Sequence, residues 1–173
     1  MLKYLPVQKN EKIKNKSFTL VEIMVVVAVI ALLAAVTIPN LLRARLNANE
    51  SATIKALKTI IAAASSYTGV NNGGYPPDFV TLSGAIPPYL DMTFTDPATR
   101  NGYTITYVPG AVIDAAGNVD SFYVTAVPLV AGTTGSRVFY IDEAGVICFA
   151  PQATPAAGAH EGGACPLGYN SLQ

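Results

Sequence analysis

The sequence predicts an α+β protein, in which one long N-terminal helix is followed by a small antiparallel β-sheet. Residues 23–42 form a run of 20 residues without a charge, which predicts an apolar first half of the helix. From residue 75 onward, short segments rich in β-branched and aromatic side chains alternate with turn residues. The expected organisation is a basic leader (1–17), an apolar helix (18–42), an amphipathic helix (43–68) and a globular head (69–173).

The apolar helix is long enough to cross a bilayer. Hydrophobic residues make up 51% of the chain and charged residues 13%, and the uncharged run accounts for much of that excess. At about 1.5 Å rise per residue it spans about 30 Å, the thickness of a hydrocarbon core. The leader, residues 1–17, carries five lysines and one glutamate. Because positive residues stay on the cytoplasmic side, the leader is expected in the cytoplasm and the head across the membrane.

The second half of the helix is amphipathic. Ile54, Leu57, Ile61 and Ala64 recur at steps of three and four, as on one helix face. Ile60 and Tyr67 lie beside that stripe. Much of the polar surface is expected to come from Arg43, Arg45, Glu50, Lys55 and Lys58.

Proline and glycine mark changes along this helix. Pro39 lacks a backbone N–H and is expected to kink or weaken the helix where it leaves the membrane. The stretch Asn71-Asn72-Gly73-Gly74 is expected to end the helix.

The head is predicted to contain three or four antiparallel strands with one face to bury. The apolar face of the amphipathic helix is the expected cover. Residues 142–145 are predicted to form a short hairpin turn. The remaining segments, 69–100 and 150–173, are rich in glycine and proline and are expected to be loops. The candidate strands are GYTITYV (102–108), SFYVTAV (121–127), RVFYI (137–141) and VICF (146–149).

The two cysteines, Cys148 and Cys165, are expected to form a disulfide if the head is exported, because that compartment is oxidising. Two buried free thiols are the alternative. A metal site formed by this pair with His160 is a weaker alternative still, because the spacing of the three residues fits no zinc pattern. Residues 59–173 carry two arginines against eight acidic side chains. No nucleic-acid partner is expected, since phosphate is met by basic patches.

No catalytic site can be assembled from the sequence, and neither an enzyme nor a cofactor is expected. Asp78, Asp91 and Asp96 lie in predicted loops with no His, Cys or Lys near them in sequence. Asp114 and Asp120, with Asn118 between them, are weakly similar to a calcium loop. They lack its remaining ligands and its bidentate glutamate. A turn between strands is favoured over a metal site.

The stretch Ser17-Phe18-Thr19-Leu20-Val21-Glu22, with lysine before it and apolar residues after it, resembles the prepilin signal of type IV pilins and type II secretion pseudopilins. The resemblance covers residues 14–40. It implies that a prepilin peptidase cuts between Ser17 and Phe18 and methylates the new amine of Phe18. It also implies that Glu22 is the acid needed for assembly and that Pro39 is the proline of the family's N-terminal helix. Glycine usually precedes the cut, and here the small Ser17 stands in that place.

Cleavage would give Glu22 a partner. A carboxylate at the centre of a membrane helix costs about 2.5–3.5 kcal/mol on insertion scales, and less near the edge. A free α-amine has a reference pKa of about 7.7–8 and is mostly cationic at neutral pH. The Phe18 amine of a neighbouring subunit would therefore offset the cost and specify register. The alternative is that Glu22 only reaches to the cytoplasmic interface.

The expected function is that of a pilin, the structural subunit of a type IV pilus-like filament. The expected partners are copies of itself, prepilin peptidase, an inner-membrane assembly platform and membrane lipid. The chain would first cross the inner membrane once and then enter an extracellular filament. A type II secretion pseudopilin is the alternative, which Tyr75-Pro76, Asp96-Pro97 and Gly102-Tyr103 favour. A simple membrane anchor, a secreted domain cut near residues 33–35 and a DNA-uptake pilin are weaker alternatives.

Overall fold

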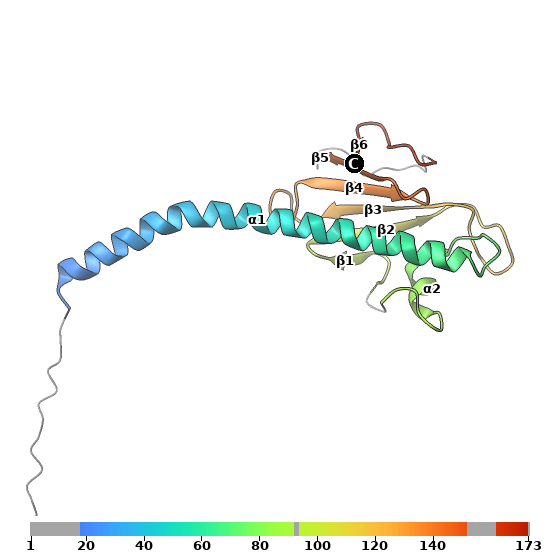
Figure 1. Cartoon of the computed structure of the whole chain (residues 1–173), viewed down its shortest axis with the longest axis horizontal. Helices are drawn as coiled ribbons and strands as arrows, with labels where there is room; N and C mark the ends of the chain where they lie inside the picture. Colours follow the sequence, from blue (N-terminus) through green and yellow to red (C-terminus); the bar gives the residue numbers. More distant parts are fainter. Residues whose placement is uncertain (1–17, 92–93, 152–161, 173) are drawn as a thin grey trace, which may run out of the picture. The chain divides into compact units, whose positions relative to one another are not determined.

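The computed structural model describes residues 18–91, 94–151 and 162–172, and it has the predicted α+β fold (Figure 1). The leader and Ser17 lie outside the described residues. Contacts divide the chain into two compact units, 1–39 and 40–173. The elements are α1 (Leu20–Thr68), α2 (Phe79–Gly84), β1 (Ala98–Arg100), β2 (Tyr103–Pro109), β3 (Phe122–Pro128), β4 (Arg137–Asp142), β5 (Ile147–Pro151) and β6 (Asn170–Ser171).

Helix α1 ends where the sequence predicts. Asn72 and Gly73 have positive φ values of 52° and 84°, a conformation that glycine and asparagine adopt most easily. The Gly73 N–H donates to the Thr68 carbonyl at 3.1 Å, which satisfies one of the last helical acceptors. Pro39 lies inside α1, and the kink expected there stays a prediction.

The six strands form one sheet in the order of the sequence, and every neighbouring pair is antiparallel. All four predicted strands are present. The predicted hairpin joins β4 to β5, and Gly145 takes a φ of 79° there. The prediction of loops was incomplete, because the segments 69–100 and 150–173 also contain the short elements α2, β1 and β6. These three elements have six, three and two residues, too few to show a period.

The main core lies between the second half of α1 and one face of the sheet. Leu57, Ile60 and Ala64 are fully buried, and strand residues such as Ile105 and Phe139 belong to the same cluster. Ile54 and Ile61 are partly buried against it. The predicted amphipathic stripe is thus confirmed. The prediction that Glu50 lies on the polar surface was wrong, because only 3% of this residue is exposed.

The opposite face of the sheet is buried as well, although one buried face was expected. Side chains alternate across a strand, so in β4 Phe139 and Ile141 join the main core while Val138 and Tyr140 point to the other side. Val138 and Tyr140 belong to a second cluster. Its other buried members are Cys148, Ala150 and Tyr169. The C-terminal segment therefore covers part of the outer face (Figure 1).

Candidate functional site

The first turn of α1 carries Glu22, and Phe18 lies just before the helix. Thr19 precedes the helix, and its Oγ1 accepts a hydrogen bond from the Glu22 N–H at 3.2 Å. This is the N-cap arrangement of a Thr followed three residues later by Glu. The spacing of Thr19 and Glu22 could have predicted the cap from the sequence. The positive end of the helix dipole also favours a carboxylate in this turn.

Phe18 and Glu22 are both exposed in the single chain, and 73% of Phe18 is accessible. Among the described residues, the Glu22 carboxylate has no hydrogen-bond or ion-pair partner. The geometry agrees with a carboxylate that pairs between subunits, and the pairing itself stays a prediction.

The apolar half of α1 has no cover within its own chain. Every residue from 18 to 42 is exposed apart from the half-buried Ala34. The most apolar 18-residue window of α1 has a mean hydropathy of 2.8, and the helix is long and apolar enough to cross a membrane. Exposed apolar patches of this size mark membrane or protein contacts. This surface therefore belongs in lipid or against other chains.

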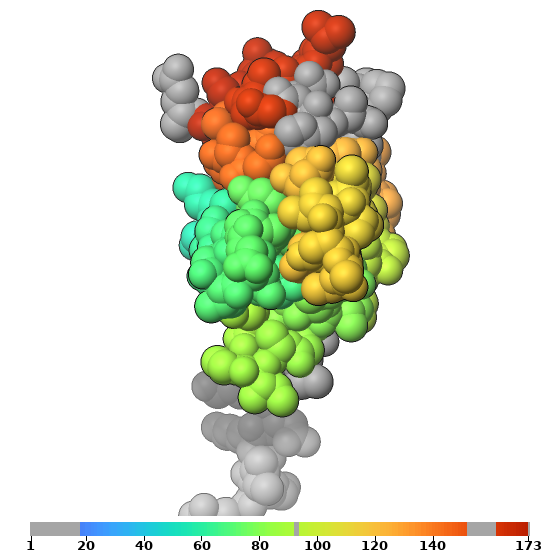
Figure 2. Space-filling model, turned by 90° about the vertical axis from the view of Figure 1, so that its right-hand side faces the viewer, coloured from blue at the N-terminus to red at the C-terminus, as the bar shows by residue number. Residues whose placement is uncertain are grey.

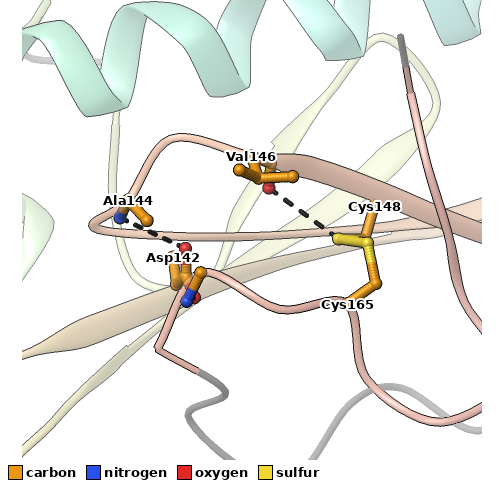
Figure 3. The surroundings of a disulfide bond; sticks show 6 residues. Asp142, Ala144, Val146, Cys148 and Cys165 are labelled. Atoms are coloured by element: carbon orange, nitrogen blue, oxygen red, sulfur yellow. Dashed lines mark hydrogen bonds between the residues drawn. A yellow bond between two sulfur atoms is a disulfide. The ribbon is translucent and has the colours of Figure 1, made fainter.

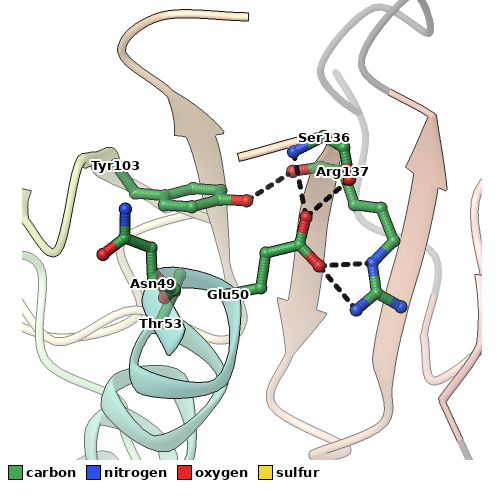
Figure 4. Close-up of polar contacts among 6 residues, drawn as sticks. All are labelled: Asn49, Glu50, Thr53, Tyr103, Ser136 and Arg137. Atoms are coloured by element: carbon green, nitrogen blue, oxygen red, sulfur yellow. Dashed lines mark hydrogen bonds and ion pairs between the residues drawn. The ribbon is translucent and has the colours of Figure 1, made fainter. Parts of the chain in front are cut away.

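A buried ion pair fixes the head onto α1 (Figure 4). Glu50 Oε2 accepts hydrogen bonds from Arg137 Nε at 2.8 Å and Arg137 Nη2 at 2.6 Å. Glu50 Oε1 accepts from Ser136 N at 2.9 Å and Ser136 Oγ at 2.8 Å. The Tyr103 hydroxyl donates to the Arg137 carbonyl at 3.0 Å. Four donors thus satisfy one carboxylate, which ties α1 to the start of β4.

These contacts shift the protonation of the two buried groups. Burial of the Glu50 carboxyl raises its pKa, but the hydrogen bonds from Ser136 and Arg137 and the guanidinium charge outweigh burial and lower the pKa below 4.5. Burial and the nearby Glu50 charge raise the pKa of Tyr103 well above its ordinary value. Glu50 therefore stays ionised and Tyr103 stays protonated at neutral pH.

Replacing Gly135 by alanine is expected to destabilise the head, because the added methyl group would overlap the Tyr103 hydroxyl. Tyr103 is fully buried and cannot easily move aside. Overpacking of this kind costs about 1–3 kcal/mol. Chemical denaturation of the full chain in detergent measures the loss. Gly84→Ala is the control, because nothing lies within 4 Å of its added carbon. Equal stability of the two variants would contradict the expected overlap.

The disulfide joins Cys148 of β5 to Cys165 of the C-terminal segment, with Cα atoms 5.6 Å apart (Figure 3). The predicted disulfide is confirmed by this geometry. Beside it, the buried Asp142 carboxylate accepts hydrogen bonds from Ala144 N at 3.2 Å and Gly163 N at 2.6 Å. Both connections hold the C-terminal segment against the outer face of the sheet.

Replacing both cysteines by alanine is expected to lower the free energy of unfolding by about 3 kcal/mol, the chain-entropy value for a loop of this size. The helix–sheet core contains neither cysteine, so the head is expected to stay folded. Limited proteolysis should then cut the segment after residue 151 first. A matching protease pattern in variant and parent would contradict this role, and reduction with alkylation of the parent should reproduce the variant.

The loop around Asp114 is a turn. Asp114 Oδ1 accepts from Ala116 N at 3.0 Å and Asn118 N at 2.9 Å, and Oδ2 accepts from Asn118 Nδ2 at 2.6 Å. These hydrogen bonds, led by that of the Asn118 side chain, lower the pKa of Asp114. Tyr67 on α1 donates to Asn118 Oδ1 at 2.7 Å. The oxygens of Asp114 thus accept from donors of the loop and that of Asn118 from α1, and the described residues contain no group of three or more His, Cys, Asp or Glu side chains that could hold a metal.

Comparisons with known proteins agree with these features. A family profile described as the prokaryotic N-terminal methylation motif matches residues 12–38. The chain is 46% identical over 57 residues to the type IV wide pilus major component PilA4 of Thermus thermophilus, covering 33% of this chain and 44% of that protein. It is 39% identical over 54 residues to the type IV major pilin protein PilA of Myxococcus xanthus, covering 31% of this chain and 24% of that protein.

The matched segments span less than half of either relative. No solved structure is matched by the chain. The long N-terminal helix, the antiparallel six-stranded sheet and the methylation motif define an α+β protein of type IV pilin-like architecture. The resemblance in residues 14–40 is thereby confirmed.

Proposed function

We propose that this chain is the structural subunit of a type IV pilus-like surface filament. The observation that supports it most strongly is the exposed apolar helix of residues 18–42, which begins at a methylation motif and leads into a folded head. A filament gives that helix a permanent apolar environment once it has left the membrane. The two relatives described above are a pilus component and a pilin, and both favour a pilus over a secretion apparatus.

Assembly in this proposal follows from the chemistry of residue 18. Prepilin peptidase removes the leader between Ser17 and Phe18 and methylates the new amine, while the head lies in the periplasm and the helix in the inner membrane. An assembly platform then transfers the subunit from lipid to the growing filament. There the Phe18 amine of one copy meets Glu22 of another. Cleavage, methylation, transfer and pairing use no catalytic group and no cofactor of this chain in this proposal, so the role of the chain is structural.

The energetic reason for transfer is that both environments bury the same surface. Leaving lipid for water would cost about 25 cal/mol for each Å² of apolar surface exposed. A helix bundle in the filament core avoids that cost, since helices pack on each other as they do in lipid. The Glu22–amine pair then selects the axial position, because a misplaced subunit leaves two charges unpaired.

Surface filaments provide the test. Filaments sheared from cells that express the chain should contain it as their main component by mass spectrometry. Deleting its gene should remove those filaments from electron micrographs, and a restored copy should return them. If the chain is missing from sheared filaments and its deletion stops protein export instead, the pilus proposal is wrong and a secretion pseudopilin replaces it.

A further inference from the structure

Two surfaces at opposite ends of the head are exposed, apolar and oppositely charged. We name the first the tip surface: Val112, Ile113, Asp114 and Asp120, in the loop between β2 and β3. We name the second the base surface: Leu129 and Val130, in the loop between β3 and β4, with Arg45 of α1. All seven residues are exposed and belong to the same compact unit.

The tip surface lies beside the C-terminal end of α1. Val112 and Tyr75 both pair with Val119 as isolated bridges, and Tyr67 contacts Asn118. Figure 2 views the head from this end and shows residues 110–120 (yellow) beside the end of the helix (green). Val112 and Ile113 expose 66% and 54% of their surfaces. The two carboxylates next to them make this apolar surface acidic.

The base surface lies near the middle of α1, where the β3–β4 loop meets the helix (Figure 1). Asn49 Nδ2 donates to the Thr134 carbonyl at 3.0 Å, and Thr134 Oγ1 accepts from Val130 N at 3.0 Å. Arg45 precedes Asn49 by one helical turn and therefore lies on the same face. Leu129 and Val130 each expose 53% of their surfaces. This apolar surface is basic.

We propose that the tip surface of one subunit docks on the base surface of a second copy in the filament, an inference that rests on the proposed function. The two surfaces differ, so the contact is heterologous, and repeating it gives an open filament. Opposite charges around apolar centres steer and orient such contacts. Tyr67 follows Arg45 by 22 positions, so the two levels lie about 33 Å apart along α1. The paired copies should be offset by about that distance along the filament axis.

Cysteine cross-linking tests the contact directly. The variant Ile113→Cys with Leu129→Cys carries one thiol on each surface, while Cys148 and Cys165 are already joined. A short bismaleimide applied to sheared filaments should link these subunits into a ladder of dimers, trimers and longer products. Each single variant should give no ladder. Val80→Cys with Leu129→Cys is the matched control, because Val80 is 60% exposed but lies on α2.

Charge reversal provides a second test. Arg45→Glu would place acids on both surfaces, and filament yield should fall about tenfold, the equivalent of a change of about 1.4 kcal/mol. Adding Asp120→Asn should restore part of the yield, because the amide is neutral and its carbonyl can keep the hydrogen bonds that Asp120 Oδ1 accepts. Lys55→Glu makes the same charge change at another exposed position of α1 and should have a smaller effect.

The outcomes separate this inference from the proposed function. Filaments that form normally but give no more ladder from the Ile113 pair than from the Val80 pair would overturn the inference and leave the proposed function standing. A product that joins the chain to a different protein would also overturn it. If the parent chain enters no filament, the proposed function fails and the inference fails with it.

Discussion

Replacing Glu22 by alanine is expected to leave a membrane-inserted, correctly cleaved protein whose filament yield falls at least tenfold. The carboxylate has no partner among the described residues of its own chain, so its removal costs the monomer little. In the proposed filament the same change would leave the cationic Phe18 amine of a neighbour unpaired. An uncompensated charge in a dry environment costs several kcal/mol, and each 1.4 kcal/mol is a factor of about ten.

A structural role for Glu22 in its own helix must be separated from this pairing. Thr19→Ala is the control, because it removes the hydrogen bond from the Glu22 N–H and keeps the carboxylate. Loss of an N-cap costs about 1 kcal/mol, and this variant should still form filaments. Shearing yield and the mass of the membrane-bound subunit are the measurements. Normal filament yield from Glu22→Ala would remove this residue from the assembly mechanism.

Replacing Glu50 by alanine is expected to destabilise the head about as much as loss of the disulfide. The change leaves the Arg137 guanidinium and the Ser136 N–H without their acceptor. Breaking a buried pair by removing one partner costs about 3–5 kcal/mol. We expect about 3 kcal/mol, since 35% of the Arg137 side chain is exposed and water can replace part of the contact. Denaturant unfolding of the full chain in detergent measures this. Lys55→Ala, an exposed change on the same helix, should stay within about 0.5 kcal/mol of the parent.

The Glu50 pair also predicts a pH dependence. The folded-state pKa of Glu50 lies below its ordinary value of 4.5, so the unfolded chain binds the proton more readily than the folded chain. The stability from this pair is therefore fully present above about pH 4.5 and is lost as pH falls through the lower, folded-state pKa. Glu50→Gln cannot titrate and should lose less stability over that interval. If the free energy of unfolding falls equally with pH in the parent and in Glu50→Gln, the acid-dependent stability does not come from Glu50.

Sequence periodicity was sufficient to predict the buried face of the helix and the four longer strands. The stripe of Leu57, Ile60 and Ala64 predicted which helix face is buried, and four alternating segments predicted four strands. Glu50 was assigned to the polar surface together with the other charged residues of this helix. Its partners, Ser136 and Arg137, lie 86 and 87 residues further along the chain. No local pattern carries a contact of that separation.

The cover on the outer face of the sheet was missed for a different reason. Tyr169 and Cys165 come from a segment rich in alanine, glycine and proline, a composition typical of loops. The segment has only the two-residue strand β6, which is too short to predict from a pattern, and the disulfide and the Asp142–Gly163 hydrogen bond also hold it in place. The cysteine pair predicted that the C-terminal segment is joined to the sheet. Which face of the sheet the segment covers depends on how side chains alternate in the folded strands.

The most direct measurement of the central claim is the N-terminal sequence and mass of the subunit recovered from membranes and from sheared filaments. The account predicts that the first residue is Phe18 and that its amine carries a methyl group. A subunit that retains the basic leader, or one that is cut within the apolar stretch near residues 33–35, would contradict this mechanism, because neither offers Glu22 a cationic partner at residue 18.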